Sequence, residues 1–445
     1  MKLNYKNTCL VGLAFMSIIA FWQLYDNVVP VLLTQTFHLD EDITGFIMSL
    51  DNILSLFMLP LFGKISDKTH TRIGKRMPYI LGGTIVTALL LNLLPIIDNG
   101  FFAGKVSFFY SLPMFVIVLG MILLAMSVYR SPAVALMPDV TPKPLRARAN
   151  AIINLMGAAG GIIYLAFTAV MFPKSKTEGL EHVNYQMLFI FMSVFMVVCV
   201  LVMHSTINEP ELSDKNGQIE KKHPEWDLTE QDKTTGHAKL PADVMRSMIF
   251  LLASIALWYI GYNAVTTWFT TYISVLMGEG LGGASTCFLI ANVGAIVSYI
   301  PIGYMAARVG RKKMIYFGTL LLTASFALCY TLTTTADSVT VPMYITFALV
   351  GVAWASISVN SLPMAVEMCK GSDAGKYTGL YYTASMAGQV ITPTLAGFLM
   401  KNVSYKILFV YATVFSLLSF ITMTQVKHGD VKADQLVGLE NFEDM

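Results

Sequence analysis

Twelve long apolar stretches most constrain the fold of this sequence. A helix needs about 20 apolar residues to cross the hydrocarbon core of a bilayer, and each stretch is of that order. The expected spans are 10–33, 43–63, 78–97, 111–137, 149–172, 185–206, 245–276, 283–306, 313–333, 341–366, 377–400 and 404–425. Charged residues form 13% of the chain, about half their share in soluble domains. The sequence therefore predicts an all-α membrane protein with twelve transmembrane helices.

Basic residues between the spans concentrate in loops of one parity. They are Lys64, Lys68, Arg72, Lys75, Arg76, Lys143, Arg146, Arg148, Arg308, Arg311, Lys312 and Lys313. Because cytoplasmic loops carry the excess of Lys and Arg, both termini are expected in the cytoplasm, and the chain is expected to be a multi-pass protein of the cell membrane. The basic loops are short and held at the bilayer surface, so no nucleic-acid partner is expected.

A polar, mixed-charge segment divides the spans into two sets of six. Residues 208–244 are expected to form a solvated cytoplasmic linker between an N-terminal six-helix bundle (1–207) and a C-terminal one (245–425), with a cytoplasmic tail over 426–445. An internal repeat supports this division. Arg72-Ile-Gly74 is echoed by Arg308-Val-Gly310, and Asp139 by Glu367. Small residues around Gly160 and Gly388 predict close helix packing.

The loop after the second span carries the most specific motif of the chain. It reads Pro60, Gly63, Ser66-Asp67, Thr71, Gly74-Lys75-Arg76 and Pro78-Tyr79-Ile80. This pattern closely resembles the gate loop of the plant sucrose–proton symporters and their animal relatives, within the major facilitator superfamily. A second stretch is similar to the same family at Pro132, Ala135, Leu136 and Asp139. The family's arginine position in that stretch is Val134 here, and Arg130 lies one turn earlier on about the same helix face.

The resemblance implies a fold, a mechanism and a set of gating residues. Two six-helix pseudo-repeats would hold a substrate site near the membrane midplane and rock against each other. The implied cargo is a neutral glycoside such as sucrose, maltose or a related α-glucoside, moved inward with a proton. The expected gating residues are Gly63, Asp67, Arg72, Gly74, Arg76, Asp139, Arg146 and Glu367, in ion pairs that hold one conformation and break in the other. In this scheme Asp67 is expected to reach Arg72 and the other basic residues of its loop.

Three ionisable residues lie inside the predicted spans, where such groups are costly and usually functional. Asp26 and Asp51 are each about eight residues from the same end of their helices, so both lie roughly 12 Å deep. Two carboxylates in low dielectric oppose each other's ionisation, so one could hold a proton. Asp26 and Asp51 are therefore expected to couple protons, with a structural role for Asp51 as the alternative. Asp26 also resembles the first-helix aspartate of the glycoside–pentoside–hexuronide cation symporters.

Arg130 is the third of these charges. Its guanidinium could hydrogen-bond sugar hydroxyls in bidentate fashion or release a carboxylate's proton. A structural salt bridge is the alternative.

Polar and aromatic side chains on several spans fit an uncharged polyhydroxylated ligand. The expected substrate-binding residues are Trp22, Gln23, Tyr25, Asn27, Arg130, Trp258, Tyr262, Asn263, Trp354, Asn360, Tyr382 and Gln389.

Enzymatic function is not expected, because the chain has no HExxH, Walker or GxSxG motif and no soluble domain. No cofactor, metal site or catalytic residue is predicted, and the expected partners are a sugar, a proton (or sodium) and the lipid bilayer, with a monomer as the functional form. Two other functions stay open. One is a proton-linked efflux or organic-acid carrier, and the other is a sugar sensor that does not transport.

Overall fold

The computed structural model describes residues 3–223, 241–368 and 374–429. These ranges are helical, and no strand occurs within them. The first half contains α1 (Tyr5–Val31), a π-helical turn (Leu32–Thr36), α2 (Glu41–Asp67), α3 (Met77–Leu91), α4 (Leu93–Phe102), α5 (Phe108–Val140), a 3-10 turn (Lys143–Leu145), α6 (Arg146–Met171), α7 (Lys174–Thr177), α8 (Gln186–Thr206) and α9 (Glu209–Lys222). The second half contains α10 (Ala242–Met277), α11 (Leu281–Val309), α12 (Arg311–Thr335), α13 (Val341–Glu367), α14 (Ala374–Asn402) and α15 (Ile407–Thr424).

The long helices coincide with the predicted spans. In the described ranges, 11 helical stretches are long and apolar enough to cross a membrane, and α3 and α4 together make one of them. The remaining predicted span, 377–400, lies in α14, which has 29 residues but a more polar middle that includes Gln389 and Pro393. The predicted all-α fold with twelve spans is therefore confirmed.

Local chemistry explains where several helices begin. Asn4 precedes α1, and its side-chain oxygen accepts a hydrogen bond from the Asn7 N–H at 3.1 Å, which satisfies one of the free donors of the first turn. Glu41 and Asp42 occupy the first turn of α2, where their negative charges interact favourably with the positive end of the helix dipole. α12 begins directly after Gly310, whose φ of 101° is strained for any residue with a side chain.

Contacts divide the chain into two compact units. Unit 1 comprises Met1–Glu230, Thr267–Thr286 and Pro393–Asn402, and unit 2 comprises Gln231–Thr266, Cys287–Thr392 and Val403–Met445. Three of the boundaries therefore fall inside the continuous helices α10, α11 and α14. The predicted division at the linker stays a prediction.

The predicted close packing at small residues is confirmed in each unit. A Cβ added to Gly160 of α6 would lie only 2.0 Å from the Met16 carbonyl oxygen of α1. In unit 2, a Cβ on Gly388 would lie 2.9 Å from the carbonyl oxygen of Ala256. Both glycines thus let two helix backbones approach more closely than alanine would allow.

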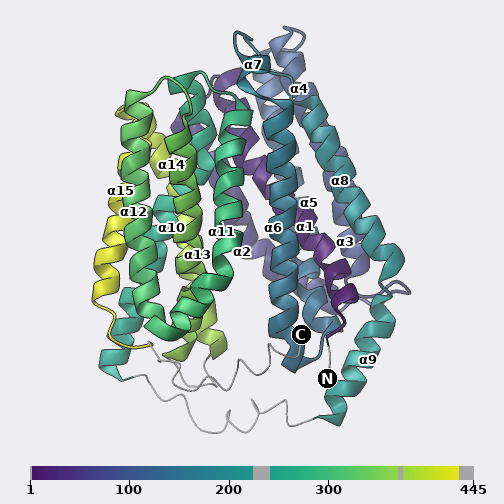
Figure 1. The fold of residues 1–445 in the computed structure, drawn as a ribbon. Helices are drawn as coiled ribbons and strands as arrows, with labels where there is room; N and C mark the ends of the chain where they lie inside the picture. The colour runs from purple at the N-terminus through teal and green to yellow at the C-terminus, as the bar shows by residue number, and fades with distance from the viewer. Residues whose placement is uncertain (1–2, 224–240, 369–373, 430–445) are drawn as a thin grey trace. The chain divides into compact units, whose positions relative to one another are not determined.

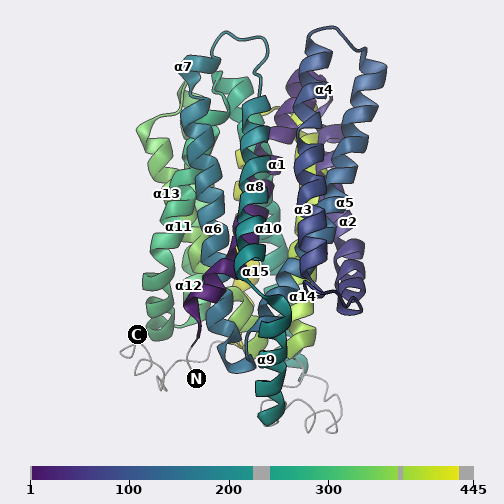
Figure 2. The same ribbon diagram turned by 90° about the vertical axis from the view of Figure 1, so that its right-hand side faces the viewer.

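The predicted solvated linker begins with a helix that is bound to unit 1. α9 lies at the end of unit 1 that carries the start of α1, opposite α4 and α7 (Figures 1 and 2). Glu209 in its first turn is only 1% exposed, and Asn216 donates to the Asp139 carbonyl at 3.0 Å. Over Glu209–Lys222 the segment is thus a helix attached to unit 1, with most of its residues at least partly exposed, and its predicted role as a cytoplasmic linker stays a prediction. The remainder of the linker, 224–240, and the tail from 430 lie outside the described residues.

Candidate functional site

Unit 1 brings the three predicted intramembrane charges together. Asp26 on α1, Asp51 on α2 and Arg130 on α5 are each partly buried. Asp51 interacts electrostatically with both Asp26 and Arg130. Asn52 also donates its amide N–H to Asp51 Oδ1 at 2.8 Å, so the structural role considered for Asp51 has a partner as well. Asp51 is thus the central member of the cluster, within interaction range of a second carboxylate and of a guanidinium.

The aromatic ring of Trp22 lies next to Arg130 of this charge cluster. The Arg130 guanidinium carbon lies 5.6 Å from the centre of the Trp22 ring, in the range of a cation–π contact. The Trp22 indole N–H is buried, and no described residue accepts a hydrogen bond from it. An unpaired indole donor beside a guanidinium is suited to a ligand hydroxyl or carboxylate.

Two other predicted substrate residues on α1 are engaged in packing in this structure. The Tyr25 hydroxyl donates to the Met48 carbonyl of α2 at 3.4 Å. Asn27 donates to the Gln23 carbonyl at 2.7 Å and accepts from Thr270 Oγ1 at 3.1 Å. Both are almost fully buried, so they shape the environment of Asp26 more directly than they offer ligand contacts.

Unit 2 gathers the predicted aromatic residues into one cluster. Trp258 stacks on Tyr259 with ring centres 3.9 Å apart, and Tyr262 stacks on Trp354 at 4.1 Å. The two pairs meet edge to face, since Trp258 and Trp354 lie 5.1 Å apart. Tyr259, from the same predicted span, is therefore also a member of this aromatic cluster.

Polar atoms around the aromatic cluster differ in availability. The Trp258 indole N–H and the Asn263 carbonyl oxygen are buried without a partner among the described residues. Asn360 is 1% exposed and donates to the Ser356 carbonyl, within its own helix. Gln389 donates to the Ser385 carbonyl at 3.3 Å, and the Tyr382 side chain is 52% exposed. The unpaired atoms of Trp258 and Asn263 are the clearest free groups for ligand hydroxyls.

Arg76 is the centre of an ion-pair network at the end of unit 1 that carries α9. Its guanidinium donates to Asp139 at 2.8 Å, to the Gly63 carbonyl at 3.3 Å and to Asp67, with which it forms an ion pair. Burial alone would lower the pKa of Arg76, but the hydrogen bonds and charges of Asp139 and Asp67 raise it above its ordinary value. The guanidinium therefore stays charged.

The structure shows which of the expected basic residues each acid of this network binds. Asp67 pairs with Arg76, whereas Arg72 is exposed. Arg146 pairs with Glu220 of α9 at 2.9 Å, and Asp139 is bonded to Arg76 and to Lys75, whose Nζ is 3.1 Å away. Asp139 is thus bound by two residues from the loop before α3.

Unit 2 repeats the arrangement. Glu367 forms an ion pair with Arg311, which follows Gly310 as Lys75 follows Gly74. Gly74 and Gly310 have φ values of 117° and 101°, so both need the freedom of glycine. Each acid is therefore bound by a basic residue just after a left-handed glycine, within one unit. Such pairs stiffen a unit, and their predicted role in gating stays a prediction.

Sequence reasoning missed a set of contacts at the opposite end of unit 1. Lys401 of α14 lies 2.8 Å from Asp40 and 3.1 Å from Asp42, and we call these three residues the Lys401 cluster. Lys174 and Glu279 form a second pair at 3.5 Å. These pairs join segments from both halves of the sequence within unit 1. The acidic residues at the start of α2 and the lysine at the end of α14 can be read from the sequence. Their pairing depends on the fold, because they are far apart along the chain.

In the described ranges, no group of three or more His, Cys, Asp or Glu side chains could hold a metal ion.

Comparison with known proteins assigns the family. A model described as MFS/sugar transport protein matches residues 10–370, most of the chain. The chain belongs to the MFS/sugar transport protein family. Its fold and family are those of multi-span membrane transporters rather than enzymes.

Individual relatives of this MFS/sugar transport protein are distant. The sucrose transport protein SUC3 of Arabidopsis thaliana is 27% identical over 224 residues, which are 46% of this chain and 38% of that protein. The match therefore spans well under half of that relative's length.

Two solved structures share the fold of the whole chain. A mutant of the nucleoside transporter NupG is 14% identical with a TM-score of 0.67, over 95% of this chain and 100% of NupG. The inward-open xylose transporter XylE from E. coli is 14% identical with a TM-score of 0.65, over 98% of each chain. At such identities the likeness concerns the fold alone.

Proposed function

We propose that this transporter imports a neutral glycoside together with a proton, with both termini in the cytoplasm. The observation that carries the proposal is the cluster of Asp26, Asp51 and Arg130 within the spans of unit 1. Two carboxylates in mutual range oppose double ionisation, so one of them holds a proton at the depth where coupling must occur. Among the interactions of these three groups, Arg130 interacts with Asp51 and not with Asp26, so Asp26 is the proposed proton carrier.

The aromatic cluster of unit 2 supports a sugar as the cargo. Its stacked rings offer apolar faces, and the unpaired atoms of Trp258 and Asn263 offer a donor and an acceptor. A glycoside has the matching combination of C–H faces and hydroxyls. The similarity to a sucrose transport protein agrees with this class of cargo.

Uptake into proteoliposomes tests the proposal. Radiolabelled maltose and sucrose are offered with an inward proton gradient, with an inward sodium gradient and with neither. The expected result is accumulation driven by the proton gradient, and its loss in Asp26→Asn with exchange of sugar across the membrane partly retained. Uphill uptake in Asp26→Asn would remove that residue from the coupling role, and accumulation driven by sodium alone would identify a different ion.

An organic-acid carrier is the second candidate, and Arg130 favours it. A guanidinium beside an unpaired indole donor could bind a substrate carboxylate. Uptake of a labelled monocarboxylate that is lost in Arg130→Lys, with no uptake of either sugar, would establish this function instead.

A further inference from the structure

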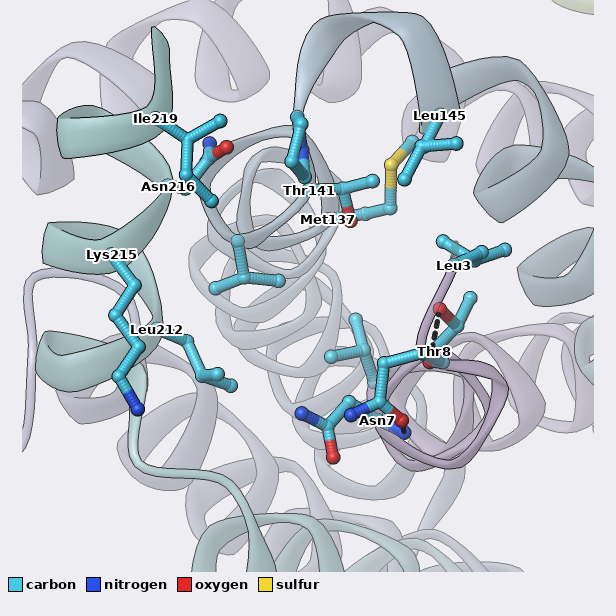
Figure 3. Close-up of a pocket in the computed structure, with 14 residues that line it drawn as sticks. Leu3, Asn7, Thr8, Met137, Thr141, Leu145, Leu212, Lys215, Asn216 and Ile219 are labelled. Carbon is cyan, nitrogen blue, oxygen red and sulfur yellow. Dashed lines mark hydrogen bonds between the residues drawn. The ribbon is translucent and has the colours of Figure 1, made fainter. Parts of the chain in front are cut away.

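Unit 1 contains a cavity of about 200 Å³ that lies apart from the charge cluster. It is lined by the start of α1, the end of α5, the turn that follows α5, and one face of α9 (Figure 3). The lining side chains on α9 are Leu212, Lys215, Asn216 and Ile219. These positions are spaced i, i+3, i+4 and i+7, so they form one helical stripe.

The walls of this cavity are held in place by bonds outside it. Glu209 at the start of α9 accepts three backbone N–H groups at the start of α3, from Lys75, Arg76 and Met77, at 2.8 to 2.9 Å. Glu220 near its end pairs with Arg146 at 2.9 Å. Because both ends of α9 are fixed to unit 1, the cavity is formed before any ligand arrives, which reduces the entropic cost of binding.

Asn216 gives the cavity a specific polar feature. Its side chain is on the cavity wall, next to Ile219 and Thr141 (Figure 3), and is 5% exposed. The amide N–H donates to the Asp139 carbonyl at 3.0 Å. The amide oxygen is buried, and no described residue donates to it. A buried acceptor without a partner is costly, so a donor brought by a ligand would be favoured there.

We infer that this cavity binds a small, mostly apolar molecule that carries one hydroxyl or amide donor for Asn216. Its volume is somewhat above the roughly 150 Å³ of an apolar cavity that accommodates benzene, so one ring with a short polar arm has a matching size. The apolar walls from α1 and α5, including Val11 and Met137, would hold the ring. Such a ligand would contact both α9 and α1. The inference does not depend on which cargo the transporter carries.

Fluorine NMR on the full chain in detergent micelles tests the inference. The probes are para-fluorobenzyl alcohol and para-fluorotoluene, which differ in the hydroxyl donor. We expect wild type to bind the alcohol roughly tenfold more tightly than Asn216→Leu does, as one hydrogen bond to a buried acceptor implies. The toluene should bind both proteins equally weakly. Asp214→Asn, at an exposed position of α9 outside the cavity, should retain wild-type binding.

A second variant keeps the test valid if Asn216→Leu fails to fold. Leu212→Trp fills the cavity and leaves Asn216 in place, so neither probe should bind it. The alcohol should also raise the unfolding temperature of wild type but not of Leu212→Trp, because a ligand of the native state stabilises it. Equal affinity of wild type for both probes would overturn the inference, and so would no binding of the alcohol at millimolar concentration. In either case a water molecule, rather than a ligand, would be the donor to the Asn216 amide oxygen.

Discussion

Gly74 shows how one backbone angle supports the ion-pair network of unit 1. Its φ of 117° turns the chain so that the N–H groups of the next residues point at Glu209. A Cβ at this position would lie 2.3 Å from the Glu209 carboxylate. Glycine is therefore required both for the angle and for the space.

Replacement of Gly74 by alanine should destabilise the protein. The backbone strain costs roughly 1–3 kcal/mol, and the displaced Glu209 carboxylate would release its hydrogen bonds. The measurement is the unfolding temperature in detergent, which should fall in Gly74→Ala. Gly82→Ala is the matched control, because a Cβ there meets nothing within 4 Å, and alanine is the better helix former. Equal unfolding temperatures for the two variants would contradict the assigned role of Gly74.

His182 should make the stability of unit 1 sensitive to acid. Its ring stacks on Phe102 at 4.4 Å and lies 2.8 Å from Asn99 Oδ1. Burial lowers the pKa of His182 below its ordinary value of 6.5, although Asp98 lies 3.3 Å away. The folded state thus favours the neutral ring more than the unfolded state does. The resulting stability is present above about pH 6.5 and is lost as pH falls through the lower folded-state pKa.

The measurement for His182 is the unfolding temperature from about pH 7.5 to about pH 5, a range that brackets the ordinary pKa of histidine. On acidification, wild type should lose more stability than His182→Gln does, and the difference between the two proteins reports the contribution of His182. His70→Gln, at an exposed position, should follow wild type. A steeper loss in His182→Gln would show that the ion pair with Asp98 outweighs burial.

Residue types were more predictable than residue partners. Asp26, Asp51 and Arg130 could be selected from sequence because charges within apolar stretches are rare, and in the structure Asp51 interacts with each of the other two. Of the basic residues that Asp67 was expected to reach, Arg76 forms the pair and Arg72 does not. Arg76 comes only four residues later, and the left-handed turn at Gly74 decides which side chain faces inward.

At the scale of elements, α9 is a short polar helix whose position depends on its two ends. Glu209 binds the start of α3, where three N–H groups lack helical partners. In the same turn, the exposed Glu211 pairs with Lys215 and accepts a hydrogen bond from the Asn208 amide. The two glutamates therefore allow the stability contributed by a buried carboxylate, which caps another helix, to be compared with that of an exposed ion pair.

Glu209→Ala should lower stability far more than Glu211→Ala. Loss of the buried carboxylate leaves three backbone donors unsatisfied, at about 1–3 kcal/mol for each group that remains buried. The Glu211 pair is exposed to water and salt, so its removal should change stability very little. Proteolysis of the linker in detergent reports release of α9, and it should accelerate in Glu209→Ala only. Equal acceleration in both variants would show that α9 is not held by Glu209.

The elements were predictable to different degrees, for a physical reason. Apolar stretches of membrane length have few alternatives to a helix, because every backbone group in lipid must be bonded internally. The twelve spans followed from this constraint. α9 has no such stretch, and its attachment to unit 1 rests on individual contacts of Glu209, Asn216 and Glu220. Sequence periodicity carries no signal for contacts of this kind.

At the scale of the whole molecule, the Lys401 cluster is a candidate for a contact that must break during transport. It joins the start of α2 to the end of α14 within unit 1. Close by, a Cβ on Gly45 would lie 2.1 Å from the Pro393 carbonyl oxygen, so α2 and α14 touch through their backbones. If the two halves of the sequence move against each other as the resemblance implies, this contact between α2 and α14 has to separate.

Lys401→Met should increase opening at this contact. Ion pairs at the protein surface are weak, so we expect only a roughly twofold to fivefold rise in the open population. Ser49, which is 2% exposed and bonded to Thr394 at 3.1 Å, is the site for a reporter cysteine. In a background without the native cysteines, thiol labelling of Ser49→Cys in detergent should accelerate by that factor. Lys406→Met, at an exposed position after α14, should leave the labelling rate unchanged.

The unit boundaries within α10 and α14 have a mechanical consequence. Both helices pass from unit 2 to unit 1 without a break, at Thr266–Thr267 and at Thr392–Pro393. Pro393 has no N–H, so the Gln389 carbonyl loses its helical donor, and the Pro393 carbonyl accepts the Trp268 indole N–H at 3.0 Å. Any displacement of one unit must therefore be absorbed as flexure of continuous helices, with α14 the more compliant of the two. The bending stiffness of the continuous helices that contain a unit boundary, α10, α11 and α14, would then contribute to the energy of the transport cycle.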